Sequence, residues 1–348
     1  MEDATVHLRI IDRALVEEYL TWERVIESQR RCFRALGEGT AILPHRTLMP
    51  GPQDSATFCY SAKLDLHAPA VAKFGSVVPA NRDRGIPSIS ALVLVTDPDT
   101  GQPSAAVEGG AITTLRTAAA SAVAVEALAT PGPVTLAVIG TGVQAVAHVR
   151  ALAHVADLAT VHLVGRCPGR ADGPAAALAR ELSLDVCPAT AQEAVRDADV
   201  VVTCTTSTTP VLEHDWVRDG ATVISVGSFT EGRTEVPTAL LARAGAVVVD
   251  HRETALDHAG SIIAALADGS LRSQDVSDLG QVLVGAAAGR RGEQDVVFYN
   301  SVGVGLQDAA AAASLLDHLP EDAGTMVSLD GEPATARSDQ SDHRSIDD

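Results

Sequence analysis

Lysine is almost absent from this chain of 348 residues. Only Lys63 and Lys73 are lysines among the 26 lysine and arginine residues, so arginine is the default cation. Arginine stays charged in proteins, whereas a buried lysine can release its proton. Lys73 lies in the apolar, strand-like segment 71–74 and is therefore a candidate for proton chemistry. Lys63 has no motif around it and is expected at the surface.

Cysteines are few and scattered. The five of them form no Cys-x-x-Cys pair and no metal-ligand spacing, so we expect reduced thiols, no disulfide and no metal. We find no apolar run long enough for a transmembrane span, and the acidic start lacks the basic and apolar regions of a signal peptide. We therefore expect a cytoplasmic protein.

Positive charge is in deficit. The 45 acidic residues outnumber the cations and leave a formal net charge of −19, which opposes binding to nucleic acid or to an anionic membrane. Any anionic ligand must therefore be held by local arginines and lysines. The length and the 46% content of hydrophobic residues fit a globular protein with two domains.

A glycine-rich turn organises the second half. The apolar run 136–139 leads into Gly140-Thr-Gly142-Val-Gln-Ala145 and then into a helical segment. In such a turn the first glycine allows the reversal and the second lets the backbone approach a pyrophosphate at the helix N-terminus. The motif alone is weak evidence, since turn glycines are common, but a second strand at 160–164 follows at βαβ spacing. We predict a dinucleotide site that includes Gly140, Thr141, Gly142, Val143 and Gln144.

The residues after that second strand bear on the choice of cofactor. Proteins that prefer NAD carry an acidic residue there, whereas this strand ends in Gly165-Arg166, with Arg170 nearby. The pattern favours NADP(H), with NAD(H) possible. The alternative is that both arginines are merely solvated.

Strands and helices alternate through the second half, which predicts an α/β fold with a doubly wound parallel sheet. The expected strands are 136–139, 160–164, 184–187, 200–203, 222–226 and 246–250, with helices at 191–196 and 254–270. Ligands of such sheets lie beyond the C-terminal ends of the strands. Thr205 belongs to a hydroxyl cluster at one of these ends, which either binds cofactor or forms a solvated turn.

The first half of the chain has a different pattern of strands and helices. We expect a strand at 8–11, a helix at 12–36, strands near 58–60 and 71–74, a hairpin of 90–96 with 103–107, and a helix at 112–129. Near the C-terminus, a strand begins at 296 and a helix covers 306–316. Residues 321–348 contain eight acidic and two basic residues, and we expect a disordered acidic tail.

These motifs together resemble the ornithine cyclodeaminase / mu-crystallin family from about residue 8 to 318. The matching segments are Ala72-Lys73-Phe-Gly with Pro79-Ala-Asn81, Ile112-Thr-Thr-Leu-Arg116-Thr-Ala-Ala119, Gly140-Thr-Gly-Val-Gln144, and Phe298-Tyr-Asn-Ser-Val-Gly303 with Gln307-Asp308. The resemblance implies a Rossmann-type domain at 130–303. It also implies an α+β domain for substrate binding and homodimer formation, at 1–129 and 304–320.

The resemblance further implies roles for three cations. Arg46 and Arg116 would bind the substrate carboxylate or its surroundings, and Lys73 would act at the reacting centre. The residues agree, because Arg46 and Arg116 interrupt apolar segments and a guanidinium binds a carboxylate with two parallel bonds. The alternatives are internal salt bridges for the arginines and a solvent-reaching strand-edge position for Lys73. Phe229 and Val302 are further expected substrate-binding positions. The further expected cofactor-binding positions are Arg116, Thr205, Val226 and Ser301.

One position departs from the cyclodeaminases. Their loop after the fifth strand carries an aspartate that handles protons at the substrate amine, and here that loop places Phe229 at its position, with Glu231 two residues away. A phenyl ring moves no protons. The leading hypothesis is therefore an NAD(P)H-dependent oxidoreductase acting on the C–N bond of a small α-imino or α-amino acid, with Lys73 as proton donor. The alternatives are an ornithine cyclodeaminase-type ammonia lyase with recycled NAD and a non-catalytic, mu-crystallin-like binding protein.

Overall fold

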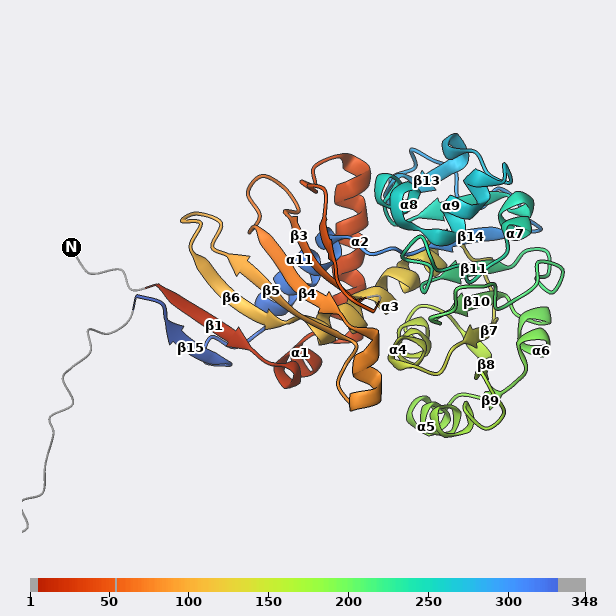
Figure 1. Cartoon of the computed structure of the whole chain (residues 1–348), viewed down its shortest axis with the longest axis horizontal. Coiled ribbons are helices and arrows are strands. Elements are labelled where there is room, and N and C mark those ends of the chain that lie inside the picture. Colours follow the sequence, from red (N-terminus) through yellow and green to blue (C-terminus); the bar gives the residue numbers. More distant parts are fainter. Residues whose placement is uncertain (1–5, 54, 331–348) are drawn as a thin grey trace, which may run out of the picture.

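The computed structural model describes residues 6–53 and 55–330, which form two sheets with their helices (Figure 1). The first sheet has seven strands in the order β15-β1-β6-β5-β4-β3-β2. Its strands are β1 His7–Ile11, β2 Thr47–Pro50, β3 Ala56–Ala62, β4 Val71–Val77, β5 Ile89–Thr96, β6 Pro103–Glu108 and β15 Thr325–Ser328. The β1–β6 pair is parallel and the others are antiparallel, and the expected β5–β6 hairpin is present.

The second sheet has eight strands, all paired in parallel, in the order β13-β12-β14-β11-β10-β7-β8-β9. They are β7 Val134–Ile139, β8 Leu158–Val164, β9 Val186–Pro188, β10 Val200–Thr203, β11 Thr222–Ser225, β12 Ala246–Val249, β13 Val276–Asp278 and β14 Val297–Asn300. The predicted α/β fold with a parallel, Rossmann-like sheet is confirmed. The short strand β13 was not expected from the sequence.

Helices flank the parallel sheet. They are α4 Val143–Leu152, α5 Asp172–Leu182, α6 Ala191–Arg196, α7 Thr238–Arg243, α8 Arg252–His258, α9 Gly260–Ala267 and α10 Leu279–Leu283. The single helix expected at 254–270 is wrong, because the backbone leaves helical geometry at Ala259, with ψ 106°. At the break, Gly260 packs so closely on the carbonyl oxygens of Arg233 and Thr230 that a side chain would collide with them.

The seven-stranded sheet packs one face against helices α3 Gly109–Leu128 and α11 Gly305–Leu316, and α2 Trp22–Glu38 packs on these two helices (Figure 1). The single helix expected at 12–36 is instead two, α1 Arg13–Tyr19 and α2. Buried Leu20 leaves helical geometry, and the Thr21 hydroxyl accepts a hydrogen bond from Arg24 N at the start of α2. Helix α3 is apolar and long enough to span a membrane by length and composition, but 72% of that stretch is buried inside the molecule. It is a core helix of this fold.

The expectation of a disordered tail beginning at residue 321 is wrong for its first part. Strand β15 pairs antiparallel with β1, so that Leu8 faces Val327. The Arg9 side chain donates to the carbonyl oxygen of Ala323 at 2.6 Å and to that of Pro320, which holds the approach to this strand. The apolar residues 326–327 form part of this strand, but the acidic composition of the whole segment led us to expect disorder. Residues 331–348 of the expected tail lie outside the described part.

Candidate active site

Lys73 lies on the helix-covered face of β4 and is only 2% exposed. Its ammonium group donates to Asp308 Oδ1 at 2.8 Å and to Thr113 Oγ1 at 2.5 Å. Burial lowers the pKa of Lys73, and the neighbouring Asp308 carboxylate opposes that shift. Lys73 is therefore a buried cation with a strong partner, and not a strand-edge lysine reaching solvent.

Asp308 joins Lys73 to the second predicted cation. It lies in the first turn of α11, and its Oδ1 is 3.4 Å from Arg116 Nε on α3. The guanidinium of Arg116 also donates to Gln307 Oε1 at 3.1 Å. The sequence reasoning used Gln307-Asp308 only as a matching motif and missed its role. The available signal was a polar pair at the start of an otherwise alanine-rich helix.

Two buried cations meet at one carboxylate in this cluster. Lys73 and Arg116 share the single carboxylate of Asp308, and all three side chains are buried. Two polar atoms inside it, Asp308 Oδ2 and Arg116 Nε, lack a hydrogen-bond partner in the structure. A buried polar group without a partner costs roughly 1–3 kcal/mol, so the cluster gains from a ligand that supplies one. A bound anion supplies the acceptor that Arg116 Nε lacks, whereas Asp308 Oδ2 needs a donor, such as an N–H group of the ligand.

Arg46, the third predicted cation, immediately precedes β2 and lines a pocket. Tyr60, Gly303 and His258 also line it. Burial raises the pKa of Tyr60, and the positive charge of Arg46 opposes that rise. Tyr60 lies opposite Lys73 across the β3–β4 pair. A side chain at Gly303 would come within 3.0 Å of the Arg116 guanidinium, so the three cations surround one region.

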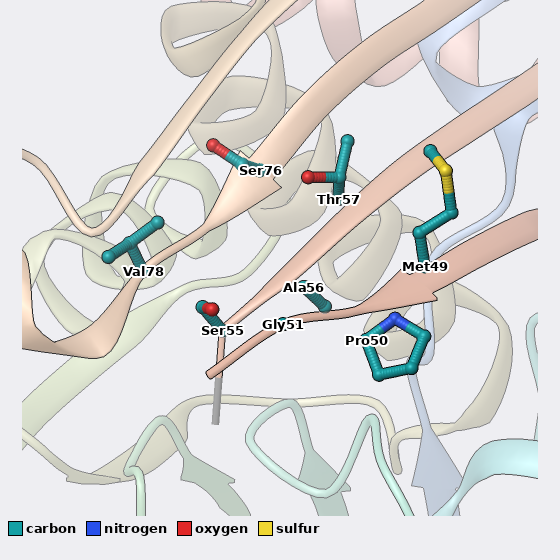
Figure 2. Close-up of a pocket in the computed structure, with 8 residues that line it drawn as sticks. All are labelled: Met49, Pro50, Gly51, Ser55, Ala56, Thr57, Ser76 and Val78. Carbon is teal, nitrogen blue, oxygen red and sulfur yellow. The ribbon is translucent and has the colours of Figure 1, made fainter. Parts of the chain in front are cut away.

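A second hollow, of about 340 Å³, lies near the ends of β2, β3 and β4 (Figure 2). Its lining residues are Met49, Pro50, Gly51, Ser55, Ala56, Thr57, Ser76 and Val78. None of these side chains carries a charge or titrates near neutral pH. The hollow offers no cation to bind a carboxylate, and the cation-lined region is the better candidate site.

The glycine turn has the geometry that a pyrophosphate needs. Gly140 has a φ of 133°, and a side chain there would lie 2.6 Å from the carbonyl oxygen of Cys204. Gly142 caps α4 without any side-chain hydrogen bond, so the first backbone N–H groups of that helix stay available. Gly142 is exposed, and the Val143 side chain is 68% exposed. These residues fit a bound dinucleotide.

The remaining positions predicted to bind the cofactor differ in how accessible their side chains are to a ligand. Thr205 donates its hydroxyl to Glu235 Oε1 at 2.8 Å, so its proton is committed inside the protein. Val226 is buried, and the Ser301 hydroxyl lies 3.5 Å from Asp250 Oδ2. Arg166 is exposed in the loop that follows β8. The cofactor roles of these residues stay predictions.

Phe229 lies half-buried in the loop after β11. Its ring is 4.8 Å from the guanidinium carbon of Arg233, a cation–π contact within the same loop. Glu231 is exposed. The placement of Phe229 and Val302 against a substrate stays a prediction.

Comparisons with known proteins agree with this geometry. The family model described as "Ornithine cyclodeaminase/mu-crystallin family" matches residues 12–322. A Delta(1)-pyrroline-2-carboxylate reductase from Bacillus cereus is 33% identical over 304 residues, covering 85% of this chain and 92% of the relative. The Thermococcus litoralis enzyme of the same name, solved with NADH and L-proline, superposes with a TM-score of 0.86 at 28% identity, covering 89% of this chain and 97% of that one.

A third similar protein is an archaeal alanine dehydrogenase, solved as a dimer with bound NAD. It superposes with a TM-score of 0.87 at 27% identity, covering 93% of this chain and 99% of that one. The family match spans both sheets and includes Lys73, Arg116 and Asp308, so it does not depend on the glycine turn alone. The chain belongs to the ornithine cyclodeaminase/mu-crystallin family.

Proposed function

We propose that this protein is an NAD(P)H-dependent oxidoreductase that acts on the C–N bond of a small α-imino or α-amino acid. The observation that carries the proposal is the buried cluster in which Lys73 and Arg116 both contact Asp308. An incoming carboxylate gives the unpartnered Nε of Arg116 an acceptor. The similarity to pyrroline-2-carboxylate reductases supports a cyclic imine as the substrate.

The chemistry divides between cofactor and protein. A bound nicotinamide supplies the hydride for the imine carbon, and the residues of the glycine turn hold its pyrophosphate. Arg46 and Arg116 bind the substrate carboxylate and fix the orientation of the C=N bond. Lys73 Nζ donates the proton that the imine nitrogen needs to become an amine. Asp308 keeps Lys73 protonated against its burial, and Phe229 forms an apolar wall.

The favoured cofactor is NADP(H). Arg166 and Arg170 lie exposed in the loop after β8, where an adenosine 2′-phosphate would be bound. The segment 165–171 contains no acidic residue that would hold a ribose 2′-hydroxyl. The five free cysteines fit the reducing environment of the cytoplasm, where we place the protein.

Incubation of the purified protein with NADPH and Δ1-pyrroline-2-carboxylate tests the function directly. Loss of absorbance of the reduced nicotinamide, together with formation of proline, supports it. Release of ammonia from ornithine without net change in the cofactor would instead identify a cyclodeaminase. Tight binding of imino acids without turnover, in the parent and in a Lys73→Met variant alike, would identify a binding protein.

We also propose a homodimer formed by the unit 1–129 and 304–320, extended by β15. Its sheet turns one face away from the helices, and that face exposes the apolar side chains Ile10, Phe74, Leu92 and Leu94. Leu92 and Phe74 are opposite each other in the β4–β5 pair, so the face is continuous. A second copy of this chain is the simplest partner that could cover this apolar face. Phe74→Glu should yield a monomer by light scattering, whereas a parent that is itself monomeric would overturn this proposal.

A further inference from the structure

Glu235 is a fully buried carboxylate of the parallel-sheet unit that the proposed chemistry does not use. It follows the loop that carries Phe229 and precedes α7. Five hydrogen bonds reach its two carboxylate oxygens, from Thr203, Ser225 and Gly227 to Oε2 and from the backbone and hydroxyl of Thr205 to Oε1. These donors are all neutral. Burying a carboxylate is expensive unless such bonds replace its water, so its position calls for an explanation.

The bonds lie at the C-terminal ends of two adjacent strands. Thr203 ends β10 and Ser225 ends β11, while Thr205 and Gly227 begin the loops that follow them. The N–H groups of Thr205 and Gly227 each donate at 2.6 Å. One carboxylate therefore fixes where both loops leave the sheet. In parallel sheets this edge is where a dinucleotide binds.

Glu235 also holds the same loops through its backbone groups. Its backbone oxygen accepts from Val211 N at 2.8 Å, so residues 205 and 211 are both tied to Glu235. Its backbone N–H donates to Ser228 Oγ at 3.0 Å, next to Gly227. A side chain at Gly227 would lie 2.6 Å from the Glu235 carboxyl carbon, so the packing leaves no slack. Both loops are thus anchored at two points on one residue.

We infer that Glu235 is a positioning residue that shapes the cofactor crevice by holding the loops after β10 and β11 in one arrangement. The inference depends on the proposed dinucleotide binding. Glu235 is buried beneath the loops and needs no contact with the cofactor. Its loss should therefore weaken cofactor binding without removing the groups that perform the reaction.

Glu235→Gln is the sharpest variant, because it keeps the size of the side chain. Both carboxylate oxygens of Glu235 accept hydrogen bonds. The amide NH₂ group of the glutamine must replace one of them and will therefore face N–H and O–H donors in either orientation. We expect the KM for NADPH to rise about 10- to 100-fold, because small displacements of binding groups have effects of this order. The kcat at saturating cofactor and the KM for the imine should change by less than about threefold. This is much smaller than the effect of displacing one binding group.

Ser225→Ala is a second variant that keeps the inference testable if the first fails to fold. The Ser225 hydroxyl is buried and donates to Glu235 Oε2 at 2.9 Å, and it is one donor among five. We expect a smaller rise in the same KM. Ser28→Ala is the matched control, because it removes a buried hydroxyl bond to the Val25 carbonyl oxygen within α2, on neither strand nor loop that Glu235 holds, and should leave cofactor binding unchanged.

Three outcomes separate the possibilities. A cofactor KM that rises in Glu235→Gln and Ser225→Ala but not in Ser28→Ala supports the inference. Folded Glu235→Gln with parental affinity for NADPH, measured by cofactor fluorescence, would overturn it. A parent protein that binds neither NADPH nor NADH would overturn the proposed function itself, and that result is recognised before any variant is made.

Discussion

Inside the seven-stranded unit two cations share one carboxylate, whereas inside the parallel-sheet unit the carboxylate of Glu235 is surrounded by neutral donors. Lys73 and Arg116 meet at Asp308, and polar atoms of this cluster are left without partners. Glu235 has five hydrogen bonds, which use both of its oxygens. The first arrangement is incomplete without a ligand, and the second is complete by itself.

The difference separates two uses of buried charge. An interior in which two cations meet at one carboxylate and a donor is unused favours an anion and suits the place where substrate binds. A carboxylate satisfied by hydroxyl and backbone groups has nothing to offer a ligand and serves to fix the chain. The parallel-sheet unit also keeps its buried histidine uncharged: burial lowers the pKa of His148 to about 4. His148 contacts Ser121 Oγ of α3 at 2.9 Å, so this neutral group joins the two units.

The largest test of this comparison is Lys73→Met, which removes the proton donor and keeps an unbranched apolar side chain. We expect kcat/KM for imine reduction to fall about 10³-fold, the middle of the range for loss of a general acid. Binding of NADPH should not change, because Lys73 belongs to the other unit. Lys63→Met is the control, since Lys63 Nζ donates only to the Leu66 carbonyl oxygen at 2.8 Å among the contacts in the described structure. Activity within a few-fold of the parent would refute the assigned role.

The next test concerns acid stability. Because the pKa of His148 falls from 6.5 to about 4 on folding, the unfolded chain binds a proton that the native protein excludes between these values. Stability should therefore be lost as the pH falls through this window, by about 3 kcal/mol from this one group. Urea unfolding at several pH values measures the slope.

The matched variants for this test are His148→Phe and His67→Phe. His148→Phe should be less stable than the parent at neutral pH, because it loses the bonds of the ring to α3 and α4, but its stability should decline less in acid. His67 is exposed, so its replacement should leave the acid slope as it is. An acid slope equal to that of the parent in His148→Phe would show that the histidine is charged in the native protein.

Much of the fold follows from local pattern, and the exceptions have physical causes. Helix 191–196 and strand 200–203 were predicted to the residue, because alternation and a capping threonine act locally. The break at Ala259 was missed, since Gly260 there packs on a loop distant in the chain, and the break at Leu20 was missed although Thr21 caps the second helix locally. Strand β15 was missed because its pairing with β1 is a contact across more than 300 residues.

The candidate site divides in the same way. Lys73, Arg46 and Arg116 could be proposed because a cation in an apolar segment is conspicuous in the sequence. Asp308 carried one signal, as half of a polar pair in an alanine-rich helix, but Glu235 could not be singled out among 45 acidic residues, because only the folded chain shows which carboxylates are buried. Their partners lie on other elements, and sequence spacing carries no record of those contacts.

The smallest effect is expected for Arg166→Asp, where the cation of the parallel-sheet unit lies at the surface in water. Replacing a phosphate partner by a like charge should raise the KM for NADPH about tenfold, or about 1.4 kcal/mol, since water screens exposed charges. The KM for NADH should stay the same, because NADH has no 2′-phosphate. Arg196→Asp is the matched control, an exposed arginine on α6 away from the loop after β8. Equal losses with both cofactors would mean that Arg166 does not distinguish NADPH from NADH and is merely a solvated surface residue.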